Sequence, residues 1–343
     1  MIEARSNPAF DRHEAVVAVG DDALGFAGFI AIHNTALGPA AGGCRIWNYA
    51  RTEDALTDAL RLSRGMTYKN AMAELPLGGG KAVIYTMGAD RNACFETFGG
   101  QVEALGGRYI TAEDVGATVA DMRAIARRTA YVAGIPKQTG QAGGDPSPMT
   151  ALGVFVSIKA LLGGSVQGRT IAVQGAGAVG YNLCKLLTEE GAKLVVADVN
   201  ENNLERAKAL GADTAPADRI HAVAADLFSP CALGAGLNAR TIPEIAAPII
   251  CGSANNQLAT EEDGARLLAR GVTYAPDYVV NAGGIINVSA EYLGEPAEVV
   301  EGRVRAIAPR LLRVLETAKA ENLTPHQAAD RIVRERIAAA KKN

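Results

Sequence analysis

The chain has 343 residues, 48% of them hydrophobic, and a formal net charge of −3 from 34 lysines and arginines against 37 aspartates and glutamates. This length suffices for two domains of about 100–200 residues each, and the near-balanced charge argues against a nucleic-acid-binding domain, which needs a strong basic excess. The polar N-terminus shows no apolar signal core, and no apolar run reaches the length of a membrane span. We therefore expect a soluble, cytoplasmic protein that binds neither nucleic acid nor membrane.

The first part of the chain alternates strand and helix patterns. Short β-branched and aromatic runs predict strands over residues 16–43, ending in a glycine-rich loop. Apolar residues at helical spacing predict a helix over residues 51–75 with Thr52 as its N-cap, and a glycine loop and a strand follow over residues 76–86. A helix, a strand ending in a loop, and another helix are predicted next, over residues 93–105, 108–116 and 119–129.

The composition then shifts to glycine, proline and serine over residues 134–151, which predicts an interdomain connection running into a helix that starts near Pro148. Strand and helix signals alternate after it, which predicts a parallel, doubly wound α/β sheet. Its strands are predicted over residues 169–174, 193–199, 226–230, 247–252 and 271–280. Thr324 as N-cap and Pro325 at the first helical position predict a final helix over residues 323–342.

The cysteines and histidines indicate neither disulfides nor a metal site. The five cysteines form no Cys-x-x-Cys pair, and the four histidines lie far apart. An odd number of scattered cysteines favours buried thiols over disulfide bridges or a structural zinc. We therefore expect no metal.

The stretch "IAVQGAGAVG" carries Gly175, Gly177 and Gly180 in the G-x-G-x-x-G pattern between a predicted strand and a predicted helix. Asp198 ends the next strand, 18 positions after Gly180 (198 − 180), near the acidic residue of the dinucleotide-binding fingerprint. An acid there accepts hydrogen bonds from ribose hydroxyls and repels a 2′-phosphate, so NAD is favoured over NADP. The alternative is a tight strand-to-helix turn without a ligand. The expected cofactor loop comprises Gly175, Ala176, Gly177, Ala178, Val179 and Gly180.

Lys81 stands between three glycines and an apolar run in "LPLGGGKAVI". Burial disfavours the charged form of lysine, so we expect Lys81 to have a lowered pKa and to transfer protons at neutral pH. Lys69 in "MTYKNA" and Asp114 in "TAEDVG" would by default be a solvated lysine and a loop carboxylate.

At this point several stretches resemble, in order, the glutamate/leucine/phenylalanine/valine dehydrogenase family, and most closely its leucine dehydrogenases. They are "MTYKNAMAELPLGGGKAVI", "RYITAEDVG", "GDPSPMTALGV", "PCALGAGLN", "CGSANNQL" and "YAPDYVVNAGGIINVSAEY". The resemblance implies that an L-amino acid and NAD⁺ react to a 2-oxo acid, ammonia and NADH. It implies two domains with a cleft between them that closes on the substrate: residues 1–135 with the terminal helix 323–343, and a Rossmann-type domain, residues 136–322. It also implies a homo-oligomer, from dimer to octamer, assembled through the first domain.

The resemblance further implies residue roles. Lys69 binds the substrate carboxylate, Lys81 activates the water that attacks the imine, and Asp114 shuttles protons to and from the amine. The remaining substrate contacts implied are Gly42, Gly43 and Asn255, and the remaining cofactor contacts are Thr150, Ala232, Leu233, Ser253, Ala254, Asn255 and Asn281.

The side-chain pocket implied by the resemblance is apolar, lined by Ala41, Met66, Ala112, Ile285 and Val288. Glutamate enzymes carry a lysine at the position of Ala41 and a serine at that of Val288. A buried, unpaired carboxylate is costly, so an apolar, branched-chain substrate is favoured over glutamate. The small Ala41 leaves phenylalanine or tryptophan as an alternative substrate, and a catalytically silent NAD-binding protein is a further alternative.

Overall fold

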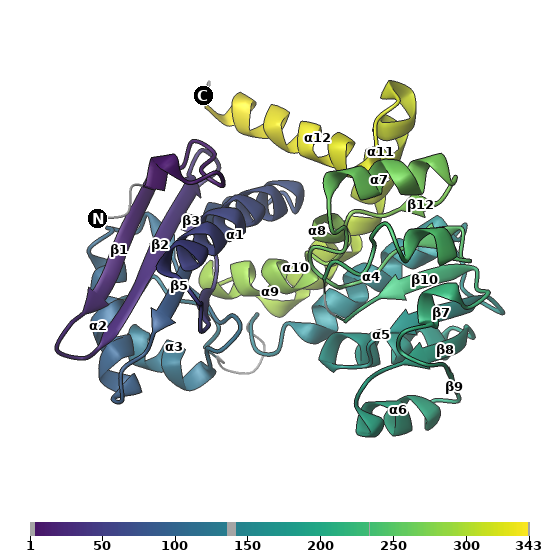
Figure 1. The fold of residues 1–343 in the computed structure, drawn as a ribbon, viewed down its shortest axis with the longest axis horizontal. Helices are drawn as coiled ribbons and strands as arrows, with labels where there is room; N and C mark the ends of the chain where they lie inside the picture. The colour runs from purple at the N-terminus through teal and green to yellow at the C-terminus, as the bar shows by residue number, and fades with distance from the viewer. Residues whose placement is uncertain (1–3, 136–141, 233, 342–343) are drawn as a thin grey trace. The chain divides into compact units, whose positions relative to one another are not determined.

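The computed structural model describes residues 4–135, 142–232 and 234–341, and the chain forms two compact units (Figure 1). Unit 1 comprises Met1–Gly144, Val288–Ala297 and Val333–Asn343, and unit 2 comprises Asp145–Asn287 and Glu298–Ile332. Each unit has its own six-stranded sheet. Both are α/β structures, as the sequence predicted.

The sheet of unit 1 is mixed. Its strands are β1 (Ala15–Asp21), β2 (Phe26–Asn34), β3 (Ala40–Ala41), β4 (Cys44–Ile46), β5 (Gly78–Thr86) and β6 (Tyr109–Ile110). β2 pairs antiparallel with both β1 and β5, while β3 and β4 lie parallel to β5 and β6 lies parallel to β3. β3 and β4 keep one register along β5, so Gly42 and Gly43, which separate them, stand opposite Gly80 and Lys81.

Helices cover both faces of this sheet. They are α1 (Thr52–Met72), α2 (Arg91–Glu103) and α3 (Val119–Ala126), and the short η1 (Ala4–Ser6) precedes β1. One core packs Leu56 and Leu60 of α1 against Val83 of β5. The core of the other face contains Phe95 of α2 and Ile125 of α3. Burying such side chains stabilises by about 1.5–3 kcal/mol each, which fixes both faces of β5.

Two details of unit 1 differ from the prediction. α1 begins one residue earlier than its predicted N-cap implies, because Arg51 occupies the N-cap position and Thr52 is already helical. Gly78 and Gly79 lie inside β5 and not in a loop before it. A Cβ on Gly78 would collide with the carbonyl oxygen of Asn34, and one on Gly79 would collide with the backbone of Thr67 in α1. The glycines therefore allow β2 and α1 to approach β5 closely.

Unit 2 contains a parallel sheet in the order β9-β8-β7-β10-β11-β12. The strands are β7 (Thr170–Gln174), β8 (Lys193–Ala197), β9 (Asp213–Thr214), β10 (Leu227–Pro230), β11 (Ile249–Ile250) and β12 (Thr273–Tyr274). Counted from β7, this is the order 3-2-1-4-5-6 of the Rossmann fold. The sequence predicted the parallel sheet but missed β9, and its last strand is shorter than expected because residues 277–280 form a helical turn.

The remaining helices lie mainly in unit 2, and α9, α10 and α12 contribute residues to both units. They are α4 (Ser147–Leu161), α5 (Ala178–Glu189), α6 (Glu201–Lys208), α7 (Glu261–Ala269), α8 (Asp277–Val280), α9 (Gly283–Tyr292), α10 (Ala297–Arg305), α11 (Ile307–Glu321) and α12 (Pro325–Ala340), with the short turns η2 (Ile220–Ala222) and η3 (Ile242–Glu244). Pro325 opens α12, as predicted. The Thr324 hydroxyl accepts from the Gln327 amide at 3.5 Å, and the Gln327 side chain accepts from the Thr324 amide at 3.0 Å.

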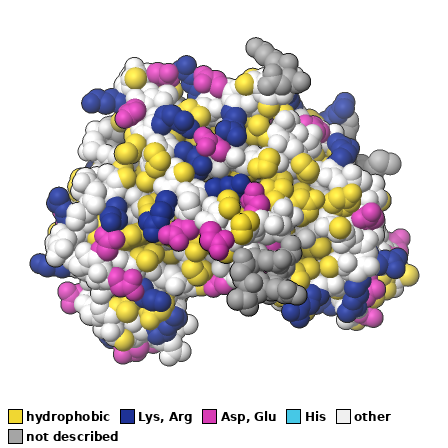
Figure 2. Space-filling model, turned by 180° about the vertical axis from the view of Figure 1, so that it is seen from behind, with side chains coloured by type: hydrophobic (Ala, Val, Ile, Leu, Met, Phe, Trp, Pro, Cys, Tyr) yellow, Lys and Arg dark blue, Asp and Glu magenta, His cyan; other side chains and the backbone are white. Residues whose placement is uncertain are grey.

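Acidic and basic side chains are interspersed on the face shown in Figure 2. Among the described residues, no helix combines the length and apolarity that crossing a bilayer requires.

Candidate active site

The two residues singled out for proton transfer in unit 1 contact each other. Lys81 of β5 is 6% exposed, and its ammonium forms an ion pair with Oδ2 of Asp114, which lies in the loop after β6. Burial alone would raise the pKa of Asp114, but the charges of Lys81 and Arg45 lower it below its usual value. The arrangement is an ionised carboxylate beside a buried amine, which can exchange protons with a bound substrate.

Bare backbone lies beside this pair. A Cβ on Gly43 would lie 2.5 Å from the carbonyl oxygen of Glu113 and 2.8 Å from the Cβ of Asp114, and one on Gly42 would collide with the carbonyl oxygen of Gly80. Only glycine fits at either position, so the structure brings Gly42 and Gly43 next to Lys81 and Asp114.

Lys69 and Met66 come from α1, one helical turn apart. Met66 lies over the paired glycines, with its Cγ 3.0 Å from a Cβ built on Gly42. Lys69 is half-buried, and its neighbour Asn70 donates to the carbonyl oxygen of Gly78 at 2.6 Å. The C-terminal part of α1 is thereby fastened to the glycine end of β5.

The expected apolar lining is divided between the units. Ala41 is buried in β3, and the carbonyl oxygen of Ala112 accepts from the Cys44 amide at 2.8 Å, so both flank the paired glycines. Val288 belongs to unit 1 and Ile285 to unit 2.

In unit 2 the glycine-rich loop has the geometry that its pattern predicts. Gly175 has φ +92°, which L side chains rarely adopt, and Gly177 is the N-cap of α5 without a side-chain cap. A Cβ on Gly180 would collide with the carbonyl oxygen of Gly175, whereas one on Gly177 would meet no atom within 4 Å. The first turn of α5 therefore offers amide donors and open space to an anion.

Asp198 lies at the end of β8 and is tied to this loop. Its Oδ2 accepts from the amide of Ala176 at 2.7 Å and from Asn203 Nδ2 at 3.2 Å, and its Oδ1 accepts from the Asn200 amide at 2.8 Å. Burial acts to raise the pKa of Asp198, but these hydrogen bonds lower it. Residues 199–203 contain no lysine or arginine that could bind a 2′-phosphate.

A second group of expected cofactor contacts also comes together in unit 2. Asn281 donates through Nδ2 to the carbonyl oxygen of Ser253 at 3.1 Å and to Oδ1 of Asn255 at 2.9 Å. Ala232 packs against Gly175, and the hydroxyl of Thr150 lies 2.8 Å from a Cβ built on Gly284. Ala254 is buried between Ser253 and Asn255. Leu233 lies outside the described residues.

The residues of unit 2 fit a nicotinamide dinucleotide. Asn281 Oδ1 is buried and accepts no hydrogen bond from the part of the chain that the structure describes, so it is an acceptor that a ligand amide could satisfy. The open first turn of α5 fits a pyrophosphate, and the ionised Asp198 fits the hydroxyls of an adenosine ribose.

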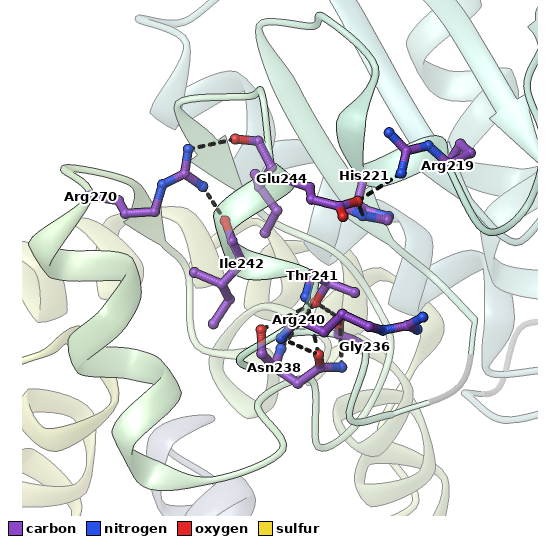
Figure 3. A network of polar contacts seen from close by, with 10 residues as sticks. Arg219, His221, Gly236, Asn238, Arg240, Thr241, Ile242, Glu244 and Arg270 are labelled. Atoms are coloured by element: carbon purple, nitrogen blue, oxygen red, sulfur yellow. Dashed lines mark hydrogen bonds and ion pairs between the residues drawn. The ribbon is translucent and has the colours of Figure 1, made fainter.

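Polar contacts secure the segment that follows β10 (Figure 3). Glu244 of η3 pairs with Arg219 at 2.9 Å and with His221 at 3.1 Å, while Arg270 donates to the carbonyl oxygens of Ile242 and Ile245. These contacts hold the backbone downstream of Ala232 without involving the expected site residues.

Three residues that contact the candidate site residues of unit 1 or the glycines beside them were not singled out by the sequence analysis: Arg45, Asn70 and Tyr109. Arg45 contacts Asp114, and the Tyr109 hydroxyl donates to the carbonyl oxygen of Gly42 at 2.7 Å. The available signal was an arginine within a short, mostly apolar strand pattern. Among the residues that the structure describes, no group of three His, Cys, Asp or Glu could hold a metal ion.

Sequence profiles of one family match most of the chain. The profile described as "Glu/Leu/Phe/Val dehydrogenase, dimerisation domain" matches residues 13–131, and that of "Glutamate/Leucine/Phenylalanine/Valine dehydrogenase" matches residues 144–200 and 196–343. The chain therefore belongs to the glutamate/leucine/phenylalanine/valine dehydrogenase family, which consists of amino-acid dehydrogenases.

Individual relatives show which members of the family this chain is similar to. A leucine dehydrogenase from Thermoactinomyces intermedius is 48% identical over 95% of this chain and 91% of its own length, and one from Bacillus subtilis is 47% identical with the same coverage. The crystal structure of L-tryptophan dehydrogenase from Nostoc punctiforme superimposes with a TM-score of 0.86 at 42% identity, covering 97% of this chain and 98% of that one.

Proposed function

We propose that this protein catalyses the NAD-dependent oxidative deamination of an apolar L-amino acid, with a branched side chain such as that of leucine preferred, and the reverse reductive amination. The observation that carries the proposal is the buried Lys81–Asp114 ion pair beside the side-chain-free backbone of Gly42 and Gly43. The identity to leucine dehydrogenases supports the same reaction.

In this proposal unit 1 handles the protons. The ammonium of Lys69 binds the substrate carboxylate, and Gly42 and Gly43 leave room for it. Asp114 takes a proton from the substrate amine, and Lys81 assists the attack of water on the imine carbon. The sum is amino acid, NAD⁺ and water giving 2-oxo acid, ammonium, NADH and a proton. Water supplies the carbonyl oxygen, and the broken C–N bond releases the nitrogen.

Unit 2 would hold the cofactor, which when bound accepts the hydride of the substrate α-carbon. The first turn of α5 would bind the pyrophosphate, Asp198 the adenosine ribose, and Asn281 the carboxamide. Because an ionised Asp198 repels a 2′-phosphate, kcat/KM should be far higher with NAD⁺ than with NADP⁺. Asp198→Ser should narrow this ratio by about 10-fold or more. Equal use of both cofactors by the wild type would contradict the choice of NAD.

The decisive experiment for the reaction is a panel of L-amino acids with NAD⁺, followed by NADH absorbance. Leucine, isoleucine and valine should be oxidised with the highest kcat/KM, and glutamate should be rejected, because neither Ala41 nor Val288 can pair with a distal carboxylate. Turnover of glutamate in preference to leucine, or of no amino acid, would contradict the proposal.

An aromatic amino acid is the second candidate substrate, favoured by the likeness to L-tryptophan dehydrogenase and by the small Ala41. Ala41→Leu fills the space beside the paired glycines. It should lower kcat/KM for phenylalanine and tryptophan more than for leucine. A wild-type preference for an aromatic substrate would select this candidate.

We also propose that the protein forms a homo-oligomer through the first part of its chain. The family profile that matches residues 13–131 is described as a dimerisation domain. Light scattering on the purified protein should give a mass of at least twice 35.6 kDa, and a monomer at micromolar concentration would contradict this.

A further inference from the structure

Arg45 contacts the carboxylate to which the proposed function gives the proton-shuttling role. It lies on β4, and its Nε stands 3.3 Å from Oδ2 of Asp114, the same oxygen that pairs with Lys81. Its Nη1 lies 3.0 Å from Oδ2 of Asp58. One guanidinium therefore bridges two carboxylates from different elements, because Asp58 belongs to α1 and Asp114 follows β6.

The far end of this bridge is itself held. The Tyr49 hydroxyl donates to the same oxygen of Asp58 that accepts from Arg45. Burial and this hydrogen bond raise the pKa of Tyr49, so the phenol keeps its proton. Cations and anions alternate along the chain of contacts from Lys81 through Asp114 and Arg45 to Asp58, and their formal charges cancel.

An arginine suits this pair of contacts better than a lysine does. The planar guanidinium presents several N–H donors in fixed directions and can hold two carboxylates at once, whereas a lysine ammonium is a single point charge on a flexible stem. Arg45 is three-quarters buried, and desolvation of its charge is offset only if both carboxylates remain in place. A lone ion pair at the protein surface, such as Arg51 with Asp54, neither holds a second carboxylate nor has a large desolvation cost to offset.

We propose that Arg45 is a positioning residue for the deamination reaction, which holds the carboxylate of Asp114 in the orientation needed for proton exchange and is anchored by Asp58 and Tyr49. The inference rests on the proposed function. The inference goes beyond the proposed function, because it assigns the orientation of Asp114 to a network that reaches from β4 to α1.

The test compares Arg45→Met, Arg45→Lys and Asp58→Asn with the wild type, using L-leucine and NAD⁺. Arg51→Met is the matched control, since it removes an arginine paired only at the surface. Arg45→Met should lower kcat by about tenfold or more, while NADH binding, followed by fluorescence, changes less than twofold. Arg45→Lys should recover part of kcat, because the positive charge is kept. Asp58→Asn should lower kcat less, and adding it to Arg45→Met should cause no further loss, because both act through one contact.

The pH profile separates positioning from a merely structural role. Among the described residues, the charged and titratable side chains that act on Asp114 or Lys81 include those of Arg45, Cys44 and Tyr109, while Asp58 and Tyr49 act on Arg45. Removing the cation of Arg45 raises the pKa of Asp114, so the acidic limb of the kcat profile should move to higher pH in Arg45→Met and less in Arg45→Lys.

The inference is overturned if Arg45→Met and Arg45→Lys both keep kcat within twofold and an unshifted profile. If Arg45→Met does not fold, Asp58→Asn decides: an unchanged kcat and profile in that variant also overturn it. A wild type that oxidises no amino acid would refute the proposed function instead, so the two failures are distinguishable.

Discussion

Replacing Asp114 by asparagine removes the negative charge beside buried Lys81 while keeping the side-chain volume. The side chains of Lys81 and Asp114 are 7% and 19% exposed. Removing one partner of a buried ion pair costs about 3–5 kcal/mol, because the other charge is left in a dry environment. Arg45 also loses a partner but keeps Asp58. Since Asp114 is not fully buried, we expect Asp114→Asn to lower the free energy of unfolding by about 3 kcal/mol, the lower end of this range.

Far-UV circular dichroism makes this cost measurable as the helices and strands of unit 1 unfold. The single tryptophan, Trp47, is less suitable as a probe, because it is already 57% exposed in the folded chain. In urea unfolding, Asp114→Asn should have a lower free energy of unfolding than the wild type. The double variant Lys81→Met, Asp114→Asn should lose less than Asp114→Asn alone, because no charge is stranded.

Asp54→Asn is the control, because Asp54 pairs with Arg51 at the protein surface, and its unfolding midpoint should stay close to that of the wild type. Two results would refute the reasoning: an Asp114→Asn variant as stable as the wild type, or a double variant whose loss equals the sum of the two single losses.

Two further predictions concern unit 1. Gly79→Ala should destabilise it by about 3 kcal/mol, the upper end for overpacking, because the new Cβ meets the backbone of Thr67 in α1. Gly65→Ala, also in α1, places its Cβ with no atom within 4 Å and should stabilise unit 1 by about 1 kcal/mol. A urea midpoint that rises for Gly79→Ala and falls for Gly65→Ala would refute this. Burial, aided by the charge of His13, lowers the pKa of His33 to about 4. Between pH 6.5 and 4 only the unfolded chain takes up this proton, so the free energy of unfolding decreases as the pH is lowered, by up to about 3 kcal/mol. His33→Gln should flatten the urea midpoint over this range, and an unchanged slope would contradict the assignment.

The sequence predicted the parts of the fold that local rules decide. The loop of Gly175, Gly177 and Gly180 follows from backbone conformation and close approach within one strand–turn–helix unit. Pro325 at the start of α12 follows from capping preferences that involve a few neighbouring residues. Thr52 was misplaced by one position because a threonine at a helix start fits N-cap and first turn almost equally.

Contacts between distant segments could not be read in the same way. The glycines of β5 were taken for a loop because their neighbours, Asn34 and Thr67, are far away in the sequence. The bridge from Arg45 to Asp58 and Asp114 joins three separate elements. A lone arginine in an apolar strand gives no local signal of its partners. The same holds for residues 288–297, which belong to unit 1 although unit 2 precedes and follows them.

The account depends most directly on Lys81, and Lys81→Ala tests it. NADH binding should stay within about twofold of the wild type by fluorescence titration, while kcat for L-leucine should fall by about 10²-fold or more. Lys159→Ala, which removes a lysine paired with Glu190 in unit 2, should keep both values and serves as the control. Turnover by Lys81→Ala at close to the wild-type rate would contradict the central claim.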